Sequence, residues 1–160
     1  MSLSLMDIEY LFKDKSYQRF SKYFPRTGDL TLIVLKGHLL IEEEINDLLS
    51  QLLKNKNYIE KAKLTCYQKI CLVESLLLTG NTKGTCFETI EKINTLRNKI
   101  AHKLEPKKLE AKVRDVIYCM FPDIKDELID TDKQIKYLKI VIPASIAQLS
   151  SIVRKLENDI

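Results

Sequence analysis

Hydrophobic residues recur along this chain with the spacing of an α-helix, and two stretches show the pattern most clearly. From about Leu30 to Lys54, the apolar positions fall on one broad face that also contains Gly37. From about Phe87 to Leu104, the apolar arc consists of Ile90, Ile93, Ile100, Ala101 and Leu104. Each stretch therefore predicts an amphipathic helix with one face in a core.

Further helices are expected between residues that cap or break helices. They span about Ser4 to Phe24, Tyr58 or Lys63 to Leu78, Lys107 to Cys119 and Thr131 to Glu157, with a short helical stretch before Thr131. Pro143 lies inside the last helix and predicts either a kink or two shorter helices. No linker divides the 160 residues, which suit one domain. The predicted fold is an all-α, single-domain helical bundle of five to seven helices, spanning residues 1–160.

Three residues on these apolar faces predict specific contacts. Gly37 permits the close approach of a neighbouring helix. Glu44 lies inside the apolar arc of its helix, and Arg97 projects into the arc of the later helix. Burying either charge is costly without a partner, and a guanidinium does not lose its proton. Glu44 is therefore the predicted structural partner of Arg97; the alternative is that Arg97 meets an anion from outside the chain.

The positive charge of the chain is concentrated around Arg97. Residues 92–114 hold eight basic and two acidic residues, a net charge of +6, whereas the rest of the chain holds 18 basic and 20 acidic residues. Such local concentration favours a polyanionic partner. Lys99, Lys103 and Lys107, spaced four apart, are the predicted contacts with a phosphate backbone; the alternative for each is a solvated helix face.

The remaining composition narrows the class of protein. The hydrophobic fraction of 45% and the charged fraction of 30% are typical of globular proteins. The four cysteines form no CxxC pair and have no histidine at ligand spacing, so no metal site and no cofactor is expected. They resemble the mainly buried thiols of a reducing compartment. No signal peptide or membrane-spanning run is visible, which predicts a cytoplasmic protein without a membrane partner.

The most distinctive motif in the chain is Leu96-Arg97-Asn98-Lys99-Ile100-Ala101-His102. An arginine, four intervening residues and a histidine, on a helix that follows a long amphipathic helix, resemble the HEPN superfamily of small helical bundles. Asn98 matches the polar residue that commonly follows the arginine. Gly37 to Leu104 is similar to HEPN proteins of the mannitol operon repressor (MltR) group, so the resemblance covers about half of the chain.

The resemblance implies a metal-independent endoribonuclease that acts as a homodimer on single-stranded RNA, as a toxin with a cognate antitoxin or in phage defence. Arg97, Asn98 and His102 would be its catalytic residues. The resemblance also implies an alternative, because some HEPN proteins are non-catalytic scaffolds or regulators. In that case the same bundle would serve as a protein-interaction module.

The chemistry of these side chains suits RNA cleavage. An imidazole transfers protons near neutral pH, and a guanidinium fits phosphate oxygens. A general base and a general acid are best served by two histidines, which a two-fold dimer would supply from two copies of His102. His38, the other histidine, is interpreted as structural, because it lies at the rim of an apolar helix face. Arg97 and His102 lining one cleft across a two-fold axis would favour the nuclease. Arg97 buried against Glu44, with His102 in open solvent far from its dimer mate, would favour the scaffold.

Overall fold

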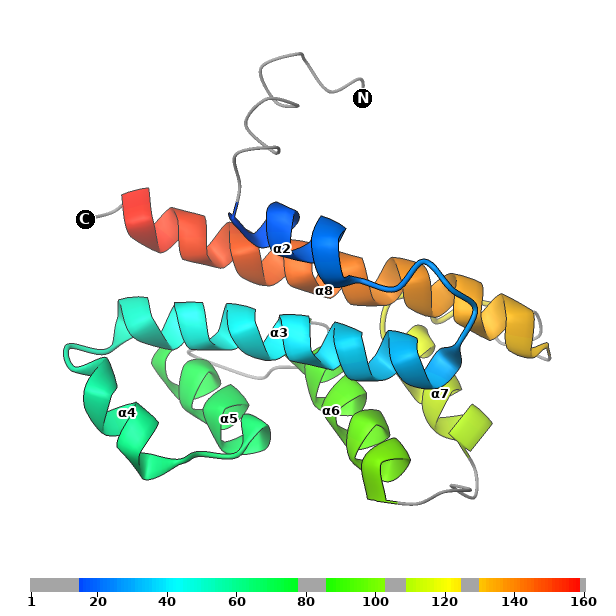
Figure 1. Ribbon diagram of the computed structural model, residues 1–160, viewed down its shortest axis with the longest axis horizontal. Coiled ribbons are helices and arrows are strands. Elements are labelled where there is room, and N and C mark those ends of the chain that lie inside the picture. The colour runs from blue at the N-terminus through cyan, green and yellow to red at the C-terminus, as the bar shows by residue number, and fades with distance from the viewer. Residues whose placement is uncertain (1–14, 78–85, 103–108, 125–129, 159–160) are drawn as a thin grey trace, which may run out of the picture.

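The computed structural model describes residues 15–77, 86–102, 109–124 and 130–158. Over these ranges the chain forms helices and no strand (Figure 1). The helices, labelled as in the figure, are α2 (Lys15–Tyr23), α3 (Leu30–Leu52), α4 (Lys56–Ala62), α5 (Cys66–Leu77), α6 (Cys86–His102), α7 (Leu109–Tyr118) and α8 (Thr131–Asn158). The predicted all-α, single-domain bundle is confirmed.

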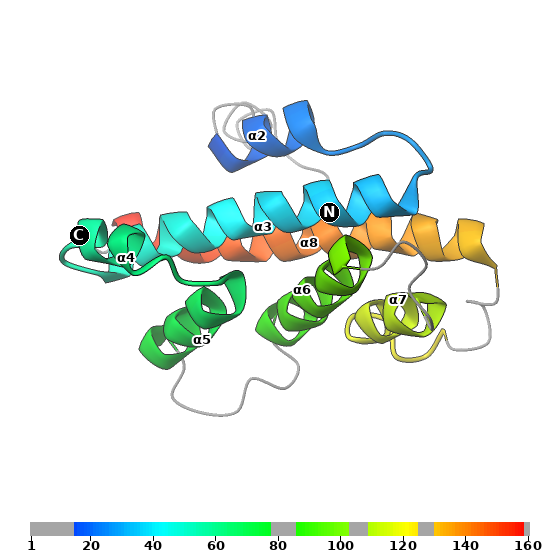
Figure 2. The same cartoon turned by 60° about the horizontal axis from the view of Figure 1, so that its bottom comes forward.

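The two longest helices form the middle of the molecule. α3 and α8 lie side by side and run in the same direction, with α2 on one side of the pair and α5, α6 and α7 on the other (Figure 2). α4 joins the end of α3 to the start of α5 (Figure 1). The central pair therefore has a helix or helices against both of its broad faces.

α3 begins and packs as its sequence predicts. Asp29 caps its first turn, where the side chain accepts a hydrogen bond of 2.9 Å from the amide of Leu32. Gly37 lies where α3 meets α8, and a Cβ atom there would come within 2.7 Å of Cγ2 of Ile142. The predicted close approach of a neighbouring helix at Gly37 is confirmed.

Of the two starts predicted for the helix that ends at about Leu78, Lys63 is close to the start of α5, whereas a single helix from Tyr58 is wrong because α4 is a separate helix. α4 ends at Ala62, and its C-cap residue Lys63 has a left-handed backbone with φ of 50°. α5 then begins with a reciprocal cap: the Thr65 amide donates to Gln68 Oε1 at 2.9 Å, and the Gln68 amide donates to Thr65 Oγ1 at 3.3 Å. Two local features thus divide a stretch whose hydrophobic period continues through the break.

The bounds of the other described helices are close to those predicted from the sequence. α8 is a single helix through Pro143, so the alternative of two shorter helices is wrong. Residues 4–14 of the predicted first helix, and most of the stretch predicted to be helical just before Thr131, lie outside the described residues. None of the described helices has the length and apolar character needed to cross a membrane.

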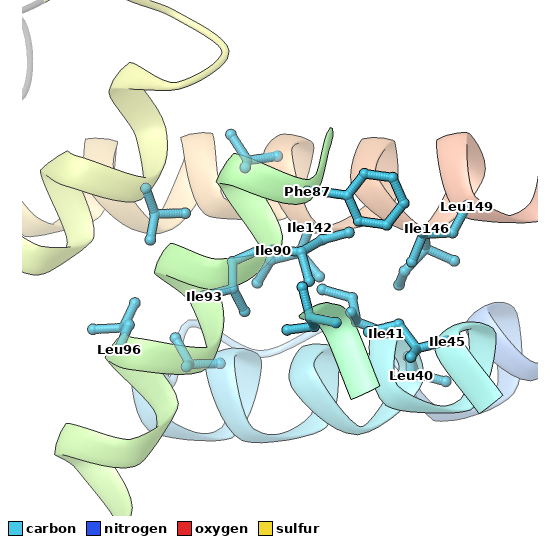
Figure 3. Packing of buried hydrophobic residues seen from close by; sticks show 14 of the residues in the cluster. Leu40, Ile41, Ile45, Phe87, Ile90, Ile93, Leu96, Ile142, Ile146 and Leu149 are labelled. Carbon is cyan, nitrogen blue, oxygen red and sulfur yellow. The ribbon is translucent and has the colours of Figure 1, made fainter. Parts of the chain in front are cut away.

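The core is built where α6 crosses the central pair. Phe87, Ile90, Ile93 and Leu96 of α6 are buried. Figure 3 shows Phe87, Ile90 and Ile93 between the side chains of α3 and α8, which include Ile41, Ile45, Ile142 and Ile146. Burial along the predicted arc decreases after Leu96: Ile100 is half-buried against the core, Ala101 is exposed, and Leu104 lies outside the described residues. The C-terminal end of α6 points away from α3 (Figure 1), so the last turn of the helix extends beyond the core.

Candidate functional site

The arginine, asparagine and histidine of the α6 motif open into one pocket. This pocket, here called the α3–α5–α6 pocket, encloses about 590 Å³. It is lined by side chains from α3, from the start of α5 and from the C-terminal half of α6: His38, Glu42, Leu64, Thr65, Cys66, Tyr67, Asn94, Arg97, Asn98 and His102. Arg97 and His102 therefore share a cavity within a single chain, although they are about 140° apart around an ideal helix.

The motif side chains lie at the edge of the core and not within it. Arg97 is half-buried, whereas Asn98 and His102 are exposed. The guanidinium donates a hydrogen bond of 3.0 Å from Nη1 to Oδ1 of Asn98. Among the described residues, no carboxylate forms an ion pair with Arg97. The arginine thus keeps most of its donors for a group that enters the pocket.

The predicted ion pair between Glu44 and Arg97 is wrong. Glu44 is buried and accepts a hydrogen bond of 2.8 Å from Ser16, and its other oxygen lies 3.3 Å from the guanidinium of Arg19. Both partners belong to α2, on the opposite side of α3 from α6 (Figure 2). The sequence pattern identified a buried carboxylate that needs a cation, but not the helix that supplies it.

The floor of the pocket contains a buried imidazole. His38 is 2% exposed, and its Nε2 lies 3.0 Å from Oδ1 of Asn94, which is also buried. Because an amide oxygen only accepts, Nε2 donates and Nδ1 carries the lone pair. Nδ1 has no hydrogen-bond partner among the described residues. Burial lowers the pKa of His38 despite the bond to Asn94, and the charge of Arg97 lowers it further. His38 is therefore neutral at pH 7.

Beside His38 lie an acidic group and a thiol. Glu42, one turn further along α3, accepts a hydrogen bond of 2.9 Å from Lys69 of α5. Cys66 is the first residue of α5, and burial is the main cause that raises its pKa to about 11. The pocket thus combines a neutral imidazole, a paired carboxylate and a protonated thiol with the exposed α6 motif.

One of the three lysines predicted to bind phosphate belongs to the described structure, and it does not line this pocket. Lys99 lies on α6 and is half-buried, while Lys103 and Lys107 lie outside the described residues. Two other cations of the basic region have local partners: Lys92 lies 3.2 Å from Glu88, and Lys112 lies 2.8 Å from Asp115. Part of the positive charge counted in residues 92–114 is thus neutralised by acidic residues just outside that window.

Several lining residues come from outside the α6 motif. Tyr67, with 52% of its surface exposed, is the tyrosine that lines the pocket. Asn94 could have been identified from the sequence, since a polar residue on the buried face of a helix requires a hydrogen-bond partner. The spacing of four residues between His38 and Glu42 was a second signal, because it places both side chains on one face of a helix. No sequence signal placed Cys66 in the pocket, because its position depends on where α5 begins.

No protein-family model, curated protein or solved structure matches this chain. Its functional interpretation therefore depends on the chemistry of the pocket.

Proposed function

We propose that this protein is a metal-independent endoribonuclease that cleaves single-stranded RNA at the α3–α5–α6 pocket. One observation carries the proposal: Arg97, Asn98 and His102 line the same cavity, and the guanidinium has no carboxylate partner among the described residues. A phosphodiester fits this arrangement because it brings the anion that Arg97 lacks to the proton-transferring group of His102.

Each side chain has a distinct role in the proposed reaction. The ribose 2′-oxygen attacks the adjacent phosphorus and loses its proton to a base. The bond from phosphorus to the 5′-oxygen breaks, and that oxygen gains a proton from an acid. The products are a 2′,3′-cyclic phosphate and a 5′-hydroxyl. Arg97 stabilises the charge on the phosphorus centre, Asn98 orients the guanidinium through Oδ1, and His102 transfers one of the protons.

A second copy of His102 in a two-fold homodimer would serve the other proton transfer. Buried His38 is the less suited group, because Asn94 holds its Nε2 and it is 2% exposed. The exposed ring of Tyr67 offers a surface on which an RNA base stacks. The four cysteines are free and half-buried, which fits the reducing conditions of the cytoplasm. A toxin or phage-defence role with a cognate antitoxin is the context that the α6 motif favours.

The test is cleavage of single-stranded RNA in EDTA by the wild type and by His102→Ala. The matched control is Thr95→Ala, an exposed residue of α6 that does not line the pocket. We expect cleavage by the wild type and the control, with cyclic phosphate ends, and a loss of at least about 100-fold in His102→Ala. Circular dichroism verifies that all three chains are folded.

Equal cleavage by wild type and His102→Ala would refute the assignment of His102. No cleavage of any RNA in a panel of varied sequences by the folded wild type would instead favour the interaction module as the function of this bundle.

A further inference from the structure

We propose that the floor of the α3–α5–α6 pocket is a binding site for a divalent transition metal of the zinc class, with His38, Glu42 and Cys66 as protein ligands. A ring nitrogen, a carboxylate oxygen and the thiol sulfur of these residues all lie within 4.8 Å of one another. Imidazole, carboxylate and thiolate are the three ligand types that zinc uses in proteins. The site is independent of the proposed RNA cleavage and is tested without RNA.

The backbone places these ligands on two helices that are already packed together. His38 and Glu42 are four residues apart on α3, so their side chains share one face of the helix. Cys66 approaches from the first turn of α5, held by the cap at Thr65 and Gln68. Ligands of a tetrahedral zinc ion lie about 3.5 Å from one another. Small side-chain rotations therefore convert the observed cluster into a coordination shell.

The imidazole of His38 has the hydrogen-bonding pattern of a metal ligand. Metal-bound histidines commonly donate their second N–H to an oxygen, which fixes the ring and its tautomer. Asn94 Oδ1 occupies that position at 3.0 Å from Nε2, and Nδ1 is left buried with no hydrogen-bond partner among the described residues. A buried lone pair without a donor is costly in a folded protein. A bound cation would satisfy it.

The other two ligands need modest changes. Lys69 donates a hydrogen bond of 2.9 Å to Oε1 of Glu42, and metal binding would use the other oxygen, Oε2. The thiol of Cys66 is protonated at neutral pH, so metal binding replaces the S–H bond with a metal–sulfur bond and releases the proton to solvent. All three ligands line the pocket, so a water molecule from the pocket would complete the fourth coordination position.

The experiment uses Co²⁺ as a spectroscopic probe of the full-length, reduced chain after treatment with EDTA and removal of the chelator. A cobalt–thiolate bond gives a charge-transfer absorption in the near ultraviolet. We expect one equivalent of Co²⁺ to produce this band and Zn²⁺ to abolish it by displacement. Cys66→Ser should abolish the band, and Glu42→Gln should weaken Co²⁺ binding by at least about tenfold.

The other cysteines provide matched controls. Cys86→Ser changes a half-buried thiol away from the pocket and should leave the band intact. Cys71→Ser tests a second cluster, in which ligand atoms of Cys71, Glu74 and Glu91 also lie within 4.8 Å of one another but include no imidazole. No band in the wild type, a band that persists in folded Cys66→Ser, or a band lost in Cys71→Ser instead would each overturn the proposed site.

Discussion

At the scale of single residues, Arg19 is the cation that stabilises the α2–α3 contact. Its guanidinium lies 3.3 Å from buried Glu44, 3.2 Å from Glu43, and also contacts Asp47. Burial opposes the charge of Arg19, but the bond to Asp47 and the nearby carboxylates outweigh burial and raise the pKa of the guanidinium. Arg97, by contrast, contributes one hydrogen bond to a neighbouring side chain on the same helix.

This difference predicts unequal losses of stability for two arginine substitutions. Arg19→Met should lower the free energy of unfolding by about 2 kcal/mol, because it leaves the carboxylate of Glu44 buried without its cation. Arg97→Met should change it by less than about 0.5 kcal/mol. Urea denaturation followed by circular dichroism measures both. A larger loss for Arg97→Met than for Arg19→Met would contradict the assigned partners.

Glu74 of α5 carries a partly buried carboxylate that lowers the stability of the fold. Its Oε1 is buried without a hydrogen-bond partner among the described residues. Burial raises the pKa of Glu74, and the charge of Glu91 raises it further. Because the pKa in the folded chain lies above the ordinary value of 4.5, the folded state binds this proton more tightly than the unfolded state. The ionised form therefore destabilises the fold at neutral pH.

Glu74→Gln should raise the free energy of unfolding at pH 7 by less than about 1 kcal/mol. The gain should disappear at about pH 3, where Glu74 is protonated in both the folded and unfolded states. Urea denaturation at the two pH values measures the gain in the free energy of unfolding. The control is Glu60→Gln, which changes an exposed carboxylate on α4. A gain of equal size at both pH values would show that the charge of Glu74 is not the cause.

At the scale of elements, the hydrophobic period predicted helices well but did not resolve the break between α4 and α5, because it left Tyr58 and Lys63 open as the start of one helix. The residue with a positive φ at this break is Lys63, and lysine seldom takes that conformation. The turn was therefore not marked by a glycine, proline or asparagine, which are the usual signals. The cap of Thr65 and Gln68 was the available signal. This break also concealed the pocket, because it places Cys66 and Tyr67 at the start of a separate helix.

The contact between α3 and α8 depends on Gly37. Gly37→Ala should lower the free energy of unfolding by about 1 kcal/mol or more, because its Cβ would lie 2.7 Å from Cγ2 of buried Ile142. This clash would exceed the gain of about 1 kcal/mol in helix propensity. Ile142→Leu, which lacks the clashing methyl group, should offset part of the loss in the double variant. Thermal unfolding and urea denaturation measure each chain.

The control for Gly37 is Gly28→Ala, since nothing lies within 4 Å of a Cβ atom at Gly28. This variant should unfold within about 0.5 kcal/mol of the wild type. Additive effects of Gly37→Ala and Ile142→Leu would show that the two positions do not contact each other.

At the scale of the whole molecule, the layering of helices on both faces of α3 decides the roles of its polar residues. The sequence predicted the all-α bundle and the long central helix. It placed Arg97 and His102 in one cleft across a two-fold axis, whereas in the structure both line one pocket of a single chain. It did not predict that Glu44 faces α2 while His38 and Glu42 face the pocket. Periodicity gives the direction of a side chain around its own helix, but which helix lies in that direction depends on packing across the chain.

The last prediction at this scale concerns the number of chains that contribute residues to one catalytic site of the proposed nuclease. One chain provides Arg97 and a single exposed histidine in its pocket, so two proton transfers require a second copy of His102. When wild type and His102→Ala are mixed in equal amounts, unfolded and refolded together, about a quarter of randomly formed dimers contain two intact chains. We therefore expect cleavage to fall to about a quarter of the all-wild-type rate at the same total concentration. Thr95→Ala as the mixing partner should leave the rate unchanged. A fall to only one half, as dilution alone produces, would show that each chain acts with its own catalytic groups.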